Sequence, residues 1–102
     1  MNPRPRSQLR SSLRPRAQLW RGLVAAHGTP LLVLDPHRVV GQYSLLTEHL
    51  RGFRLHYAVK ALPHPAVLTV LAACGSSFDV ATTAEVDLVG SLGIAMERCI
   101  YT

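Results

Sequence analysis

The sequence predicts an α/β fold in which helices pack on a parallel β-sheet. Short apolar, strand-like runs alternate along the chain with segments of about 8–15 residues in which apolar side chains recur at helical spacing. This alternation is typical of right-handed βαβ units, whose strands lie parallel in one sheet. Glycine and proline residues separate most of the runs, and they indicate where one element ends and the next begins.

The first half of the chain predicts a helix, a strand and a second helix. Residues 16–27 carry an apolar stripe at helical spacing, and a glycine follows as a C-terminal stop. Residues 31–34 are wholly apolar, which favours a short buried strand. Asp35 and Pro36 then predict a helix start, because a carboxylate caps free N–H groups and proline fits the first helical position. This helix should end near Gly52.

The second half predicts strands and helices in alternation. The strands are expected at residues 53–60, 78–81 and 99–101, and the helices at residues 65–74 and 82–92. Thr82 and Glu85 have the S/T-x-x-E spacing of a capping box, which indicates where the last helix begins.

Charge is distributed unevenly along the 102 residues. The net charge is +5, yet residues 1–34 contain six arginines and no acid, whereas residues 35–102 contain five basic and six acidic side chains. Residues 1–16 combine five arginines with three prolines, which predicts a basic disordered tail. Residues 17–102 are then the folded domain, and 48% apolar residues overall is a globular composition.

Three interpretations of the tail remain open. It is a solvated extension without a function of its own, an organelle transit peptide, or a contact for nucleic acid. The prolines interrupt any amphipathic helix, and no aromatic residues are interleaved for base stacking. No apolar segment suits a secretory signal, and none approaches the ~20 residues needed to cross a membrane.

The cysteines and histidines do not predict a metal site. Cys74 and Cys99 lack CxxC spacing, and the five histidines lack the spacing of ligands on one helix. The cysteines are therefore interpreted as small buried residues of a protein from a reducing compartment.

Lys60 is the only lysine in the chain. It stands at the expected C-terminal end of the strand at residues 53–60, before Pro63 and Pro65. A primary amine in such a position suits covalent capture of a carbonyl, which the arginine guanidinium cannot perform. The alternative is an ordinary surface lysine at a strand end.

Asp79 is the second candidate for the site. In a parallel barrel the functional side chains lie at the C-terminal ends of strands, and Lys60 and Asp79 both satisfy this rule. Asp79 shares its strand face with Ala81, so we expect it to point where Lys60 points on the neighbouring strand. A carboxylate there would favour the ammonium form of the amine and orient it. The alternative for Asp79 is a helix-capping or turn residue.

Several segments, in order and at this spacing, carry a resemblance to a known family. They are residues 28–33 (GTPLLV), 57–61 (YAVKA), 71–82 (LAACGSSFDVAT), 85 (E), 92–93 (LG) and 97–102 (ERCIYT). Together they resemble the pyridoxal-phosphate-dependent ornithine/diaminopimelate/arginine decarboxylases, whose barrel is similar to that of alanine racemase. The resemblance covers roughly residues 17–102 and leaves only the tail outside it.

The resemblance implies a fold, a cofactor and a reaction. The fold is a pyridoxal-phosphate-binding (β/α)8 TIM barrel, followed by a β domain to which the first strand often contributes. Lys60 is implied as the catalytic lysine that bonds to pyridoxal 5'-phosphate, Asp79 as a cofactor-binding neighbour, and Glu85 as a recurrent glutamate. The implied reaction removes the carboxylate of an ornithine-like basic amino acid, as in polyamine metabolism. Family members homodimerise, and a cytoplasmic location is expected, with organelle targeting as the alternative.

Two residues depart from the family pattern. Leu62 stands where a small polar residue is usual, which changes the rim of the site. His56 stands where an apolar residue is usual, and we expect it to be a hydrogen-bonded core histidine on the lysine face.

The length of the chain limits what it can do alone. A whole barrel needs about 250 residues, and this sequence supplies three of its strands, the last ending with the chain. We therefore expect a truncated N-terminal portion with little or no activity alone. The alternatives are another alanine-racemase-like protein, which residues 78–82 disfavour, and a non-catalytic partner-binding relative, which retention of Lys60 disfavours.

Overall fold

The structure is a computed structural model that describes residues 6–102, with side chains from Arg16 onward. The chain divides into two units, residues 1–34 and residues 35–102. None of the described helices is both long and apolar enough to cross a membrane.

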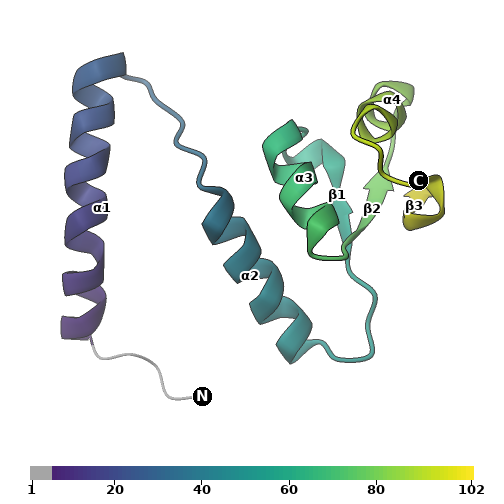
Figure 1. Ribbon diagram of the computed structural model, residues 1–102, viewed down its shortest axis with the longest axis horizontal. Coiled ribbons are helices and arrows are strands. Elements are labelled where there is room, and N and C mark those ends of the chain that lie inside the picture. The colour runs from purple at the N-terminus through teal and green to yellow at the C-terminus, as the bar shows by residue number, and fades with distance from the viewer. Residues whose placement is uncertain (1–5) are drawn as a thin grey trace. The chain divides into compact units, whose positions relative to one another are not determined.

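The first unit consists of helix α1 (Arg6–His27) and the segment that follows it (Figure 1). The helix begins ten residues before the expected start at Arg16, so residues 6–16 are helical instead of disordered. Apart from Pro15, this stretch contains only residues that a helix tolerates, and it has no glycine. The remaining five residues of the expected tail lie outside the described part.

The structure contradicts a second expectation, the short buried strand at residues 31–34. They form no strand, and the sheet of the described residues contains only strands from the second unit. Leu32 is 83% exposed, and Leu31 and Val33 are exposed as well. An apolar run becomes a strand only where another strand accepts its backbone hydrogen bonds. Within its own unit this segment has none.

The second unit alternates helices, strands and short 3-10 turns. Its elements are α2 (Pro36–His49), β1 (His56–Ala58), η1 (Val59–Ala61), α3 (Pro65–Ala73), β2 (Ser77–Val80), α4 (Thr83–Ser91), η2 (Met96–Arg98) and β3 (Cys99–Tyr101). This order confirms the predicted alternation, although β1 is shorter than the predicted strand 53–60.

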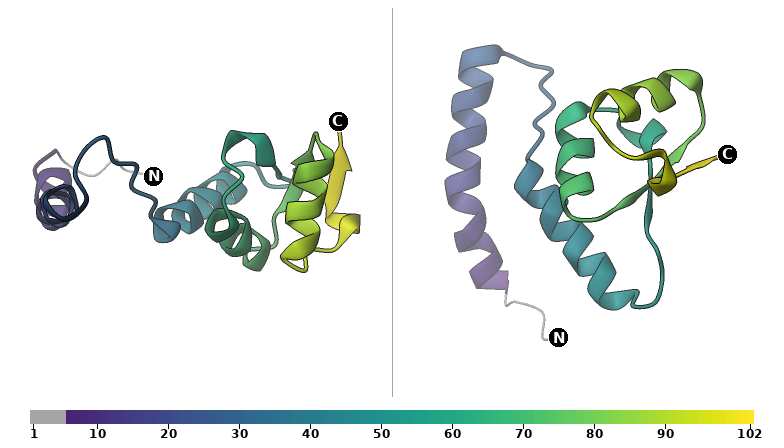
Figure 2. Two further views of the ribbon diagram at one scale, coloured as in Figure 1. Left: turned by 90° about the horizontal axis from the view of Figure 1, so that it is seen from above. Right: turned by 45° about the vertical axis from the view of Figure 1, so that its right-hand side comes forward.

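The three strands form one parallel sheet in the order β1-β2-β3. Because both crossovers step in the same direction and right-handed connections are the rule, α3 and α4 must cover the same face. Figure 2 shows these two helices and the strands from two further directions. Ala58 pairs with Asp79, and Asp79 pairs with Ile100, so these three residues share the opposite face.

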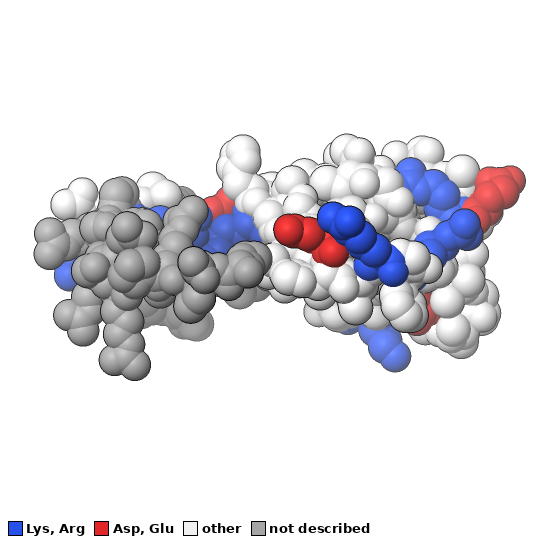
Figure 3. All heavy atoms as spheres, turned by 90° about the horizontal axis from the view of Figure 1, so that it is seen from below, with Lys and Arg blue, Asp and Glu red and all other residues white. Residues whose placement is uncertain are grey.

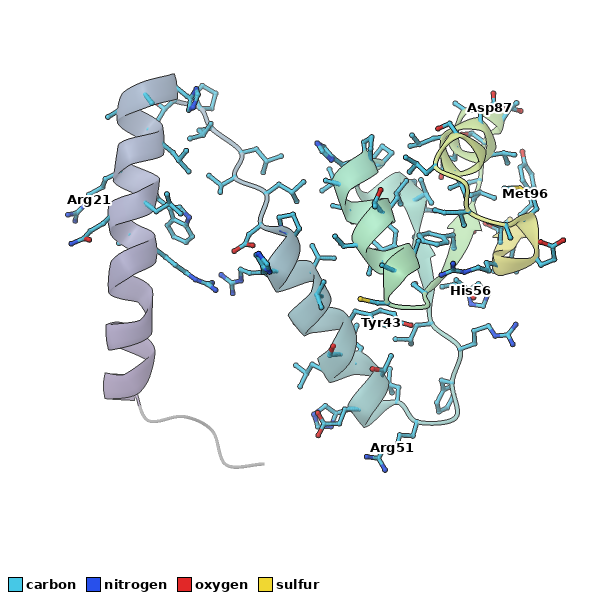
Figure 4. All side chains as sticks on the ribbon, in the orientation of Figure 1. Arg21, Tyr43, Arg51, His56, Asp87 and Met96 are labelled. Carbon is cyan, nitrogen blue, oxygen red and sulfur yellow. The ribbon has the colours of Figure 1, made fainter. Side chains whose placement is uncertain are left out.

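The core lies between the sheet and the helices on this one face. Its buried apolar residues are Val59, Val67, Leu68, Leu71, Phe78, Val80, Val89 and Ile94. Helix α2 packs on α3, and Tyr43 projects from α2 toward α3 in Figure 4. In the space-filling view of Figure 3, basic and acidic side chains are interspersed over the face shown, in keeping with the near-balanced charge of residues 35–102.

Side chains fix the starts of the helices. Asp35 Oδ1 accepts the N–H of His37 at 3.0 Å and caps α2, as the sequence predicts. His64 Nδ1 accepts the N–H of Ala66 at 3.1 Å and caps α3 in the same way. This second cap was not predicted, since histidine is not one of the preferred capping residues.

Candidate functional site

Lys60 lies in η1, the turn that directly follows β1. The expected strand therefore ends two residues earlier, at Ala58, but it still delivers the amine to its C-terminal end. Val59 is fully buried and anchors the turn, while Lys60 is exposed. The amine is consequently held on a fixed piece of backbone and remains open to solution.

Tyr57 secures the far side of this turn. Its hydroxyl donates to the carbonyl of Leu62 at 3.0 Å, spanning the turn that carries Lys60. Burial raises the pKa of the Tyr57 phenol above its ordinary value of 10.0, so the hydroxyl keeps its proton near neutral pH. Leu62 is the residue that departs from the usual pattern at the rim of the site. Its backbone carbonyl thus helps to hold the turn that carries Lys60.

Lys60 borders an open pocket of about 440 Å³. The pocket is lined by Lys60, Pro63, Thr82, Ala84, Glu85 and Leu88. Two elements supply these residues, the segment after β1 and the first turns of α4. The pocket therefore lies beyond the C-terminal ends of the strands, where parallel sheets carry their sites.

Glu85 does more than cap α4. Its backbone N–H donates to Thr82 Oγ1 at 3.1 Å, and the Thr82 hydroxyl donates to Glu85 Oε2 at 2.9 Å. This confirms the predicted cap, although the carboxylate accepts the hydroxyl and not the backbone N–H of the usual capping box. The side chain is only 9% exposed, and its second oxygen, Oε1, is buried without a hydrogen-bond partner.

This unpaired oxygen was not predicted from the sequence. A buried acceptor without a donor is uncommon and calls for an explanation such as a bound group. Because Glu85 lines the same pocket as Lys60, the pocket combines a primary amine with a carboxylate that can accept a further hydrogen bond. The capping-box spacing was the only signal for Glu85 apart from the family resemblance.

Asp79 is a residue of strand β2, and not the capping residue of α4, which is Thr82. Its half-buried carboxylate accepts a hydrogen bond from the hydroxyl of Thr102 at 2.6 Å. The described residues that line the pocket of Lys60 do not include Asp79. The two are related through the sheet, since Asp79 pairs with Ala58, two residues before Lys60.

His56 differs from its expected role. It begins β1 but is exposed, so it is not the core histidine that the sequence predicted. Figure 4 shows its ring on the other side of the strand from α3. The face of the sheet that it shares with Ala58 and Asp79 is the one that α3 and α4 leave uncovered, which explains the exposure.

The cysteines are free thiols and both are half-buried. Burial raises the pKa of the Cys99 thiol, although the positive charge of Arg98 opposes this. A raised pKa disfavours the thiolate and therefore nucleophilic reactivity. Within the described residues, no group of three or more histidine, cysteine or acidic side chains is arranged to hold a metal ion.

Comparison with known proteins gives this arrangement a family. Residues 37–102 match the family model of the pyridoxal-dependent decarboxylases, in their pyridoxal binding domain. The chain belongs to this family. Membership confirms the predicted fold class, because the second unit is then the N-terminal part of the pyridoxal-phosphate-binding barrel.

Individual decarboxylases of the family support the assignment. The lysine/ornithine decarboxylase of Selenomonas ruminantium is 38% identical over 73 residues, which are 72% of this chain and 19% of the relative. The crystal structure of lysine/ornithine decarboxylase from Vibrio vulnificus complexed with putrescine superimposes with a TM-score of 0.78 at 45% identity, covering 82% of this chain and 23% of that one. The chain thus spans about a fifth of the length of these decarboxylases.

A further solved structure bears on the cofactor. SrLDC in complex with PLP and cadaverine superimposes with a TM-score of 0.74 at 31% identity, covering 80% of this chain and 23% of that one. The residues present here fit a cofactor that carries an aldehyde. Lys60 offers an exposed amine at the pocket, and Glu85 Oε1 offers an acceptor that no protein donor occupies.

Proposed function

We propose that this chain is the N-terminal part of a pyridoxal-phosphate-dependent decarboxylase that acts on a basic amino acid of the ornithine or lysine type. One observation carries the proposal. The only lysine of the chain borders a pocket at the C-terminal end of a parallel strand, together with a buried carboxylate of which one oxygen has no hydrogen-bond partner. Lysine/ornithine decarboxylases among the family members that match this chain support the substrate class.

Pyridoxal phosphate, when bound, supplies an aldehyde that captures amines and a ring that takes up the electron pair left by decarboxylation. The protein supplies position and charge. Lys60 would hold the cofactor through its Nζ, and the turn fixed by Val59 and Tyr57 sets where that nitrogen lies. Glu85 Oε1, which is buried at the same pocket without a hydrogen-bond partner, would accept a hydrogen bond from a donor held there.

Two finer points belong to the same proposal. We infer that the whole protein forms homodimers, as implied by the family resemblance, and that amino-acid side chains from outside this chain complete the substrate site. We also place it in the cytoplasm, supported by two free thiols and the metabolic role of the family.

The amine of Lys60 can be tested directly. The chain is incubated with pyridoxal phosphate, reduced with borohydride, digested and mapped by mass spectrometry. We expect the pyridoxyl group on the peptide that contains Lys60. The mapping is clear because Lys60 is the only lysine, so the α-amine of Met1 is the one other primary amine.

Two controls complete the experiment. Lys60→Arg keeps the positive charge but has no primary amine, and Lys60→Ala removes both, so neither should carry the group at position 60. Labelling confined to Met1, or equal labelling of Met1 and Lys60, would contradict the proposal.

A further inference from the structure

Thr102 directly follows β3 and does not line the pocket of Lys60. Its backbone N–H donates to the carbonyl of Val80 at 3.1 Å and so continues the parallel ladder between β2 and β3. The register pairs Asp79 with Ile100, and Thr102 is two residues further along β3. Side chains two residues apart on a strand share a face, so Thr102 lies on the face that carries Asp79.

The two side chains are joined by a short hydrogen bond. Thr102 Oγ1 donates to Asp79 Oδ1 at 2.6 Å, a length typical of a hydroxyl bound to a charged carboxylate. Such bonds are stronger than those between neutral groups. With Oδ1 engaged in this way, the orientation of the carboxylate is fixed and Oδ2 remains for a second donor.

The backbone around this bond is itself held in place. The guanidinium of Arg98 donates to the carbonyl of Ala72 at 2.9 Å and to the carbonyl of Ser76. These bonds tie the start of β3 to the end of α3 and to the residue before β2. The register that sets Thr102 beside Asp79 is therefore fixed at both ends of β3.

We propose that Thr102 is a positioning residue. It orients the Asp79 carboxylate on the face of the sheet that the helices leave uncovered, beside strand β1, which leads into the turn of Lys60. The role rests on the proposed function, in which Asp79 is the neighbour of the cofactor that the family resemblance implies. The order of residues across the strand ends supports it. Lys60 lies two residues after Ala58, and Ala58 pairs with Asp79 in the sheet. The carboxylate of Asp79 in turn accepts the hydrogen bond from Thr102.

The test compares three variants of the full chain. Thr102→Val removes the hydroxyl while keeping the branched shape that suits a strand, and Thr102→Ser keeps the hydroxyl. Thr69→Val makes the same change at an exposed threonine of α3. Thr102→Ala is a second deletion of the hydroxyl, to be used if circular dichroism shows that Thr102→Val is unfolded.

The first readout needs no cofactor. The carboxyl 13C resonance of Asp79, assigned by its disappearance in Asp79→Asn, reports the environment of the carboxylate at fixed pH. We expect the resonance to move in Thr102→Val and to stay at the wild-type position in Thr102→Ser and Thr69→Val. An unmoved resonance in Thr102→Val would overturn the proposal.

The second readout is the concentration of pyridoxal phosphate needed for half-maximal labelling of Lys60. We expect this concentration to rise about fivefold in Thr102→Val, because the variant loses a hydrogen bond to a charged group. Thr102→Ser should restore the wild-type value. Equal values for Thr102→Val and wild type would overturn the role of Thr102. If wild type itself shows no label on Lys60, the proposed function fails, and the carbon resonance alone then decides whether Thr102 orients Asp79.

Discussion

At the scale of single residues, the candidate site depends on groups that look ordinary in isolation. A lone lysine after a strand is usually a surface residue, and a glutamate at the third position of a helix is usually part of a cap. Here one pocket is bordered by both, and one oxygen of the glutamate is buried without a donor. The shared pocket therefore supports the chemical role proposed for Lys60, which its exposure alone would not.

Tyr57 is the residue whose removal should loosen this arrangement without touching the pocket. Tyr57→Phe keeps the ring but loses the hydrogen bond to the carbonyl of Leu62. We expect the free energy of unfolding to fall by about 1 kcal/mol, the usual net value of such a bond. Urea unfolding of wild type and variant measures this, with Tyr101→Phe as the control at an exposed tyrosine.

The burial of Tyr57, which raises the pKa of its phenol, predicts a pH dependence. The pKa of Tyr57 is raised in the folded protein, so its contribution to stability is fully present below the unfolded value of about 10 and is lost as pH rises through the folded value. The difference in stability between wild type and Tyr57→Phe should hence be constant from neutral pH to about 9 and shrink above 10. A difference that grows with pH over this range would contradict this.

At the scale of elements, side chains at the ends of helices decide where the site lies. Thr82 accepts the N–H of Glu85 and donates to its carboxylate, so one threonine both begins α4 and holds the glutamate that borders the pocket. We expect Thr82→Ala to lower the free energy of unfolding by about 1 kcal/mol and Thr82→Ser to restore most of it. Denaturant unfolding measures the effect. Thr83→Ala, at the exposed next position, is the matched control.

Arg98 is the other element-scale support. Its guanidinium binds two carbonyls, of Ala72 and Ser76, and lies 5.9 Å from the centre of the Phe78 ring. Arg98→Met keeps the apolar stem but leaves both carbonyls without this donor. We therefore expect the free energy of unfolding to fall by about 1–3 kcal/mol. The same change at the exposed Arg54 should have little effect, and equal losses for the two variants would show that Arg98 is not a specific support.

Elements whose signals are local were the ones that the sequence could predict. Asp35 and Thr82 mark their helices because a cap needs only residues a few positions apart. The apolar run at residues 31–34 was wrongly assigned to a strand, because a strand depends on a partner elsewhere in the chain. Likewise, Lys60 and Asp79 could be chosen from strand ends, while the bond from Thr102 to Asp79 depends on the register of β2 and β3, which no local pattern encodes.

At the scale of the whole molecule, one face of the sheet is covered and the other is not. Helices α3 and α4 bury Phe78 and Val80, while Ile100 and His56 on the opposite side are exposed. A closed barrel would enclose that second face, and a closed barrel of this type has eight strands. The three strands present here cannot close by themselves.

The open sheet predicts that the purified 102-residue chain does not catalyse decarboxylation by itself. In a barrel enzyme the catalytic groups come from the ends of several different strands, and water is excluded by the loops around them. This chain supplies Lys60 and Glu85 to a pocket that is open to solution, and Asp79 from the neighbouring strand β2. It should therefore capture pyridoxal phosphate weakly at Lys60 and still fail to turn over substrate. Release of carbon dioxide from carboxyl-labelled ornithine or lysine, measured with added cofactor, should not exceed that of Lys60→Ala. Turnover well above this background would mean that the three strands alone carry a competent site, and that the enclosing barrel is not needed for the reaction.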